Sequence, residues 1–156
     1  MPHFIVESKS PLRLWFSDEE HAFDRAAAEA AKIQRAGGLV GVGSHGQFQG
    51  LGYHWEMWAL SSGGMAPMEV LRAATIDGAE ILGRHAEIGS REPGKFADLV
   101  ILDANPLDDI RNTNEIDRVM QNGRVYDADS MDQVWPENKA LEPLWFWNED
   151  PVPRTR

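Results

Sequence analysis

The sequence predicts an α/β fold, on the strength of an Ala-rich helix, an apolar run directly after it, and a change to short strands beyond residue 87. Residues 18–36 carry apolar side chains at helical spacing, and Gly37-Gly38 supplies the left-handed conformation that ends many helices. The apolar run at residues 39–43 is predicted to be a buried strand. A helix, a short turn and such a strand are the components of a parallel α/β fold.

The first helix has a recognisable start. Ser17 and Glu20 have the spacing of a capping box, and Asp18 favours the positive end of the helix dipole. Three shorter helices are predicted further along, with Pro67 in a first turn and Gly83 after the last one. They cover residues 53–60, 67–75 and 76–82, so that residues 1–86 form one helix-rich region.

From residue 87 the pattern changes to strands and turns. Residues 98–102 form an apolar run typical of a buried strand, and Asn122-Gly123 is the strongest two-residue signal for a β-hairpin. We therefore predict a β-rich segment over residues 87–127. Residues 128–156 are acidic and rich in Trp, and they are predicted to form a tail that docks on its own domain or on a partner.

Composition excludes several classes of function. The chain has 156 residues with 15 Lys and Arg against 25 Asp and Glu, a net charge of −10, which disfavours nucleic acid and anionic membranes as partners. The absence of Cys excludes disulfides, thiolate zinc sites and Cys nucleophiles. There is no apolar run long enough to span a membrane and no signal-peptide pattern at the start. The compartment stays open between cytoplasm and periplasm.

The candidate for chemistry is a Gly-rich loop after the predicted strand. His45 lies in it, one or two residues past the strand, where an α/β barrel carries its active site. The chain has five His residues, and neither a His-x-His nor a His-Glu-x-x-His pair is present. A hydrolytic metal centre needs about three protein ligands, so His45 alone does not make one.

Two stretches resemble a known family. Residues 64–127 are similar to the C-terminal part of the amidohydrolase superfamily, through the segments GMAP at 64–67, GSREPGKFADLV at 89–100 and NGRV at 122–125. Residues 43–56, GSHGQFQGLGYHWE, resemble a loop of the imidazolonepropionase-like branch, in particular of members linked to β-propeller domains.

This resemblance implies the C-terminal fragment of a (β/α)8 barrel, ending in the strand at 39–43, plus part of a small β-sandwich. Most members of the superfamily have, at the position of His45, an Asp that binds metal and handles the proton of the attacking water. His45 is therefore expected to act as a metal ligand or as the proton shuttle. Gln47, Gln49 and Tyr53 are expected to face the substrate. The implied cofactor is a divalent metal, with zinc expected first and iron or manganese as alternatives.

The other metal ligands of the superfamily come from earlier strands, and none is found in residues 1–38. The first hypothesis is therefore part of a metal-dependent amidohydrolase that hydrolyses a C–N bond of a small amide-type substrate. Alone, such a part is expected to hold no complete site and to be inactive. The second hypothesis is a non-catalytic module that forms homo-oligomers through exposed sheet edges and the Trp-rich tail.

Overall fold

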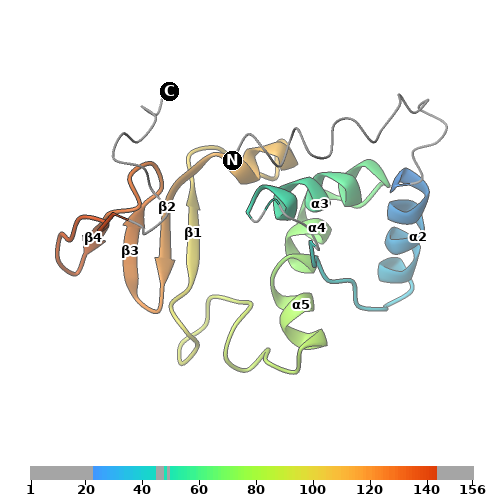
Figure 1. Cartoon of the computed structure of the whole chain (residues 1–156). Coiled ribbons are helices and arrows are strands. Elements are labelled where there is room, and N and C mark those ends of the chain that lie inside the picture. Colours follow the sequence, from blue (N-terminus) through green and yellow to red (C-terminus); the bar gives the residue numbers. More distant parts are fainter. Residues whose placement is uncertain (1–22, 45–47, 49, 144–156) are drawn as a thin grey trace, which may run out of the picture.

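A computed structural model of the chain describes residues 23–44, 48 and 50–143. Figure 1 shows helices from the first part of the chain on one side and an antiparallel sheet from the second part on the other. The chain is therefore a mixed α/β structure whose helical and β-rich parts follow each other in sequence.

Helix α2 spans Phe23–Arg35. Asp24 lies in its first turn, and Lys32 and Arg35 lie in its last, so the charges complement the helix dipole at both ends. Gly37 follows with a φ of 86°, the left-handed conformation that the sequence predicts after this helix. Residues 18–22 and the predicted capping box lie outside the described residues.

Residues 39–44, all described, do not form the strand predicted at 39–43. A strand is stabilised by pairing with its neighbours, and no described strand lies beside this segment. Instead the amide of Val42 donates to the carbonyl of Ala73 at 3.2 Å. Leu39 remains 43% exposed. The segment thus has the apolar composition of a barrel strand, but it lacks the backbone hydrogen bonds to a neighbouring strand that would make it one.

Three helices follow: α3 (Leu51–Ser62), α4 (Pro67–Ala73) and α5 (Ile76–Ile81). The sequence predicts them at 53–60, 67–75 and 76–82, so the boundaries differ by up to two residues. Helix α4 begins at Pro67, which lacks an amide hydrogen, and Glu69 accepts a bond from the amide of Ala66 at 2.8 Å. Proline and carboxylate together account for the start of this helix.

The core of the helical part includes a side chain from the β-rich part. Val70 of α4 is fully buried, and it belongs to a cluster that takes in Ile110, which is 8% exposed. Ile110 begins the 3₁₀ helix η3 (Ile110–Asn114), which connects two strands. The other buried members of the cluster are Ala31, Met57, Leu60, Met65 and Ala73. The predicted boundary near residue 87 is therefore not a boundary of the core.

A polar contact joins three of the helices. Asp77 of α5 is 3% exposed, and its carboxylate accepts bonds from Arg72 of α4 at 2.9 Å and from Gln34 of α2 at 3.3 Å. The amide group of Gln34 also donates to the carbonyl of Glu69 at 3.2 Å. These bonds fix the ends of α4 and α5 against the last turn of α2.

The sheet has four strands in the order β1-β2-β3-β4, and every neighbouring pair is antiparallel. Strands β2 and β3 form the hairpin that Asn122-Gly123 predicts. Both turn residues have positive φ, 49° and 77°, as a two-residue type I′ turn requires. The strands are β1 (Leu99–Leu102), β2 (Ile116–Gln121), β3 (Arg124–Asp127) and β4 (Gln133–Trp135).

Strand β4 lies in the region predicted as a tail at 128–156, so the sheet extends beyond residue 127. Its edge is partly covered, because Gln133 exchanges two backbone bonds of 2.9 Å with Lys139. The sequence also predicts part of a β-sandwich. The described residues form one sheet, without a second sheet stacked on it.

Candidate functional site: the loop between residues 44 and 52

The loop with the predicted site residues leaves the extended segment at Ser44 and returns to α3. A Cβ atom added at Gly52 would lie 3.5 Å from Cβ of Ser44, so the two ends of the loop touch. The amide of Gly43 donates to Glu56 of α3 at 3.3 Å. The N-terminal half of α3 therefore holds the two ends of the loop close together.

Gly50 explains how the chain enters α3 so abruptly. Its φ is 82°, which favours Gly, and the amide of the next glycine, Gly52, donates to the carbonyl of Phe48 at 2.8 Å. The ring of Phe48 lies 5.7 Å from that of Trp55 between centroids, with the planes tilted by 52°. This aromatic contact packs one side of the loop against α3.

His45, Gln47 and Gln49, three of the four predicted site residues, lie outside the described residues. Tyr53, the fourth, is in the first turn of α3, and its hydroxyl donates to the carbonyl of Ala74 at 2.5 Å. Burial, and secondarily the nearby carboxylate of Glu56, raise the pKa of Tyr53, so its phenol stays protonated at neutral pH. Tyr53 is thus a hydrogen-bond donor that is engaged with the end of α4 in this structure.

His54 is a residue that the sequence did not single out, and its role here is structural. Its Nδ1 lies 3.2 Å from Oγ1 of Thr113 in η3, and Trp58 donates to the same oxygen at 3.1 Å. Burial lowers the pKa of His54, which favours the neutral ring. His54 and Trp58 therefore connect α3 to η3, and the sequence spacing gives no signal of this long-range contact.

The described residues do not fit a hydrolytic metal centre. Within residues 23–44, 48 and 50–143, no three His, Asp or Glu side chains are grouped so that they could hold a metal ion. Such a centre needs about three protein ligands.

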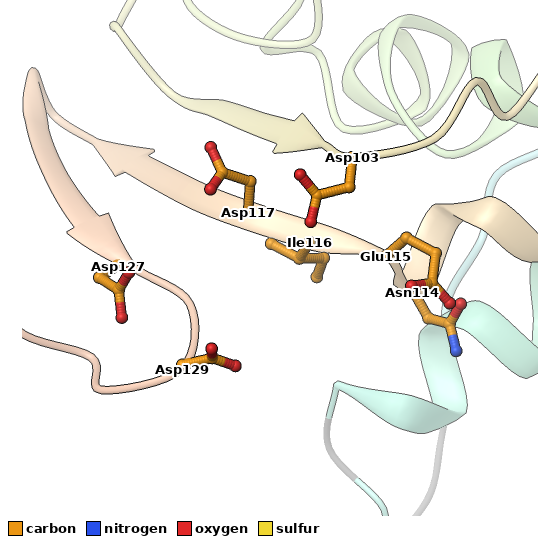
Figure 2. A pocket seen from close by; sticks show the side chains of 7 residues that line it. All are labelled: Asp103, Asn114, Glu115, Ile116, Asp117, Asp127 and Asp129. Carbon is orange, nitrogen blue, oxygen red and sulfur yellow. The ribbon is translucent and has the colours of Figure 1, made fainter. Parts of the chain in front are cut away.

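An acidic hollow lies elsewhere, at one end of the sheet. Figure 2 shows Asp103 directly after the tip of β1, with Asp117 on the neighbouring strand. The hollow measures about 480 Å³, and five of its seven lining residues are carboxylates. They are Asp103, Glu115, Asp117, Asp127 and Asp129, with Asn114 and Ile116 completing the wall. None of the described residues of the loop at 44–52 lines this hollow, and no sequence motif indicated it.

The chain belongs to the amidohydrolase family, whose model matches residues 16–126, more than half of the chain. Among curated proteins, it is 44% identical over 64 residues to an imidazolonepropionase of Shouchella clausii, which is 39% of this chain and 14% of that protein. It is 36% identical over 92 residues to an S-triazine hydrolase of Gordonia rubripertincta, 49% of this chain and 19% of that one.

Among solved structures, the chain is similar to a Xaa-Pro dipeptidase with methionine bound in its active site. The TM-score is 0.61 and the identity 26%, over 80% of this chain and 32% of the dipeptidase. The chain thus spans a third or less of the length of these relatives. The matches favour the hydrolase hypothesis over the non-catalytic module.

No helix in the described residues is long and apolar enough to cross a membrane.

Proposed function

We propose that this chain supplies the C-terminal part of a metal-dependent amidohydrolase that hydrolyses a C–N bond in a small amide, cyclic amide or dipeptide-like substrate. The observation that carries the proposal is the placement of the loop. It follows an apolar extended segment and is closed onto α3 through Gly43 and Gly52, within the stretch that the family model matches. In α/β barrels the loops after the strands carry the chemistry.

In this proposal His45 is a metal ligand or the proton shuttle, and Gln47 and Gln49 contact the substrate. Imidazole suits either role, because it binds metals when neutral and its usual pKa is near neutrality. Tyr53 contributes a protonated phenol, which must leave the carbonyl of Ala74 before it can donate to a substrate. The metal, with zinc expected first and iron or manganese as alternatives, would supply the activated water.

The isolated chain is expected to be inactive, because the described residues hold no group of three metal ligands. The test is the metal content of the purified chain by mass spectrometry, with its native mass and its hydrolysis of Xaa-Pro dipeptides measured on the same sample. We expect well below about one metal per chain and no hydrolysis above the buffer rate. One zinc or iron per chain that disappears in His45→Ala would show that a complete site forms in this chain alone. The native mass also tests the homo-oligomer predicted from the sequence.

The role of the loop can be tested separately in a complete relative. Residues 43–56 would replace the equivalent loop of the Xaa-Pro dipeptidase to which this chain is similar. We expect the graft to keep its metal and measurable hydrolysis. His45→Ala in the graft should lose about 100-fold in activity, the upper end of the loss seen when a residue that only supports a metal ligand is removed. A Ser44→Ala graft is the matched control. Equal activity of the His45→Ala graft and its parent would refute the role of His45.

A further inference from the structure

The turn between β2 and β3 contains the one Asn-Gly pair of the sequence, Asn122 and Gly123. An Asn followed by Gly loses its side-chain amide group more readily than other Asn residues, because Gly has no side chain beside its amide nitrogen. The other five Asn of the sequence are each followed by a residue with a side chain, namely Pro106, Thr113, Glu115, Lys139 and Glu149. Asn122 is therefore the residue of this chain whose chemistry favours deamidation.

The reaction takes place within the turn and consumes one water molecule. The amide nitrogen of Gly123 attacks the side-chain carbonyl carbon of Asn122, and a new N–C bond closes a five-membered imide. The bond between Cγ and the side-chain nitrogen breaks, and ammonia leaves with the proton of the Gly123 amide. Water then opens the imide at one of its two carbonyl groups, which leaves either Asp or isoaspartate at this position.

The conformation of the turn opposes the attack. Gln121 pairs with Arg124, and the two residues between them have positive φ, as in a type I′ turn. Such a turn holds ψ of its first central residue at about +30°. In the imide, the attacking nitrogen and Cβ of Asn122 lie on the same side of the bond between Cα and the backbone carbonyl carbon, whereas at this ψ they lie on opposite sides. The imide can therefore form only after Asn122 leaves the left-handed conformation.

Two hydrogen bonds hold the turn in this conformation from outside the hairpin. The amide of Gly123, whose nitrogen is the attacking atom, donates to the carbonyl of Ala97 at 3.0 Å. The amide of Asn122 donates to Oδ1 of Asp98 at 2.6 Å. Both acceptors directly precede β1, the strand that pairs with β2 (Figure 1). The turn is thus fixed to a third strand as well as by its own hairpin.

We propose that Asn122 is a site of spontaneous deamidation that the folded sheet blocks, and that it reacts when the turn separates from Ala97 and Asp98. Asn122 is already exposed, so the rate follows the population of the open turn and not the access of water to the side chain. The isoaspartate product lengthens the backbone of the turn by one carbon atom, which a two-residue turn does not accommodate. The modification therefore keeps the turn open once it has occurred. This inference does not depend on the hydrolase function proposed above.

The test incubates the full chain at mildly alkaline pH and follows the conversion of Asn122 by mass spectrometry of its tryptic peptide, residues 119–124. A capped synthetic peptide with the sequence of residues 118–127 serves as the unstructured reference. We expect the folded chain to convert at least about tenfold more slowly than the peptide, because two hydrogen bonds and the turn must open first. Equal rates in the folded chain and in the peptide would overturn the proposal.

Matched variants test the contact with the segment before β1. Asp98→Ala removes the acceptor of the Asn122 amide and is expected to raise the rate in the folded chain about three- to tenfold. Asp108→Ala removes an exposed carboxylate between β1 and η3, and this control should react at the rate of the parent. The tryptic peptide that carries Asn122 is the same in both variants, and circular dichroism checks that both fold. Equal rates in the two folded variants would contradict the role of Asp98.

A second measurement needs no variant. Hydrogen exchange of the Gly123 amide, followed by NMR in the isotope-labelled full chain, requires the bond to Ala97 to open, as deamidation does. We expect this amide to exchange at least about tenfold more slowly than the same amide in the reference peptide. Exchange at the rate of the peptide would show that the turn is open in solution, and the proposal would be wrong even if Asp98→Ala failed to fold.

Discussion

Gly63, the residue directly after α3, packs tightly against α2, and replacing it by Ala tests the packing of these two helices. Gly63 follows α3 with a φ of −76° and a ψ of 0°, which Ala adopts without strain. A Cβ added there would lie 2.3 Å from the carbonyl carbon of Ala27, 2.4 Å from its Cβ and 2.5 Å from the amide nitrogen of Ala28. Two of these three atoms belong to the backbone of α2, so a change of side-chain rotamer cannot relieve the contact.

The expected magnitude follows from two opposing terms. Overpacking costs about 1–3 kcal/mol, and α2 must move by about 1 Å to restore normal carbon–carbon separations. Replacing Gly by Ala also restricts the unfolded chain, which offsets about 0.4–1 kcal/mol. Because the clash involves backbone, we expect Gly63→Ala to lower the free energy of unfolding by about 2 kcal/mol.

The assay is urea unfolding followed by far-ultraviolet circular dichroism. Gly43→Ala is the matched control, because nothing lies within 4 Å of the added Cβ and the φ of Gly43 is not in the left-handed region. The control is expected to be unchanged or slightly more stable. A double variant with Ala27→Gly should recover little stability, since it removes only one of the three contacts. If Gly63→Ala is as stable as Gly43→Ala, the close packing of α2 on α3 is refuted.

Three further changes test other parts of the structure. Gly123→Ala should lower the free energy of unfolding by about 1–2 kcal/mol in the same assay, because the hairpin turn holds this residue at a φ of 77°; no loss would exclude the type I′ turn. Asp77→Ala should cost about 1–3 kcal/mol, because it removes the acceptor of one partly buried amide hydrogen of Gln34 and of the guanidinium of Arg72, whereas exposed Asp108→Ala should cost little. Burial lowers the pKa of His54 below its usual 6.5. The contribution of the neutral ring to the free energy of unfolding is therefore complete above pH 6.5, and it is lost as the pH falls through the lower pKa of the folded state. The difference in free energy of unfolding between the parent and His54→Asn, measured by urea titration, should therefore become smaller as the pH falls from about 7 to about 5. A difference that becomes larger would contradict burial of the neutral ring.

The helices were the part of the fold that could be predicted best, because their signals are local. Pro67 marks the first residue of α4, and Gly37 marks the end of α2 through its positive φ. The hairpin at Asn122-Gly123 is local in the same way. In each case the conformational preference of one or two residues determines the local backbone structure, and contacts with distant residues add to its stability.

Features that depend on distant partners could not be predicted. Residues 39–43 have the composition of a strand, yet a strand exists only when another pairs with it. Strand β4 is short, and it is held by pairing with β3 on one side and by the bridge from Gln133 to Lys139 on the other. For the candidate site, the sequence indicated the loop and Tyr53, but the bond from Tyr53 to Ala74 crosses 21 residues and leaves no local pattern. The expectations for His45, Gln47 and Gln49 stay predictions.

The position of Ile110 has a consequence for how this chain can be divided. The sequence changes character near residue 87, and a cut there is the natural choice for expressing the helical part by itself. Such a cut would remove Ile110 from the cluster around Val70, and with it the carbonyl and hydroxyl groups to which Trp58 donates. The helical piece would then have an uncovered hole in its apolar core, and the β-rich piece would expose the side chain that filled it. The two regions therefore differ in composition but form one unit of folding, and they are expected to unfold together.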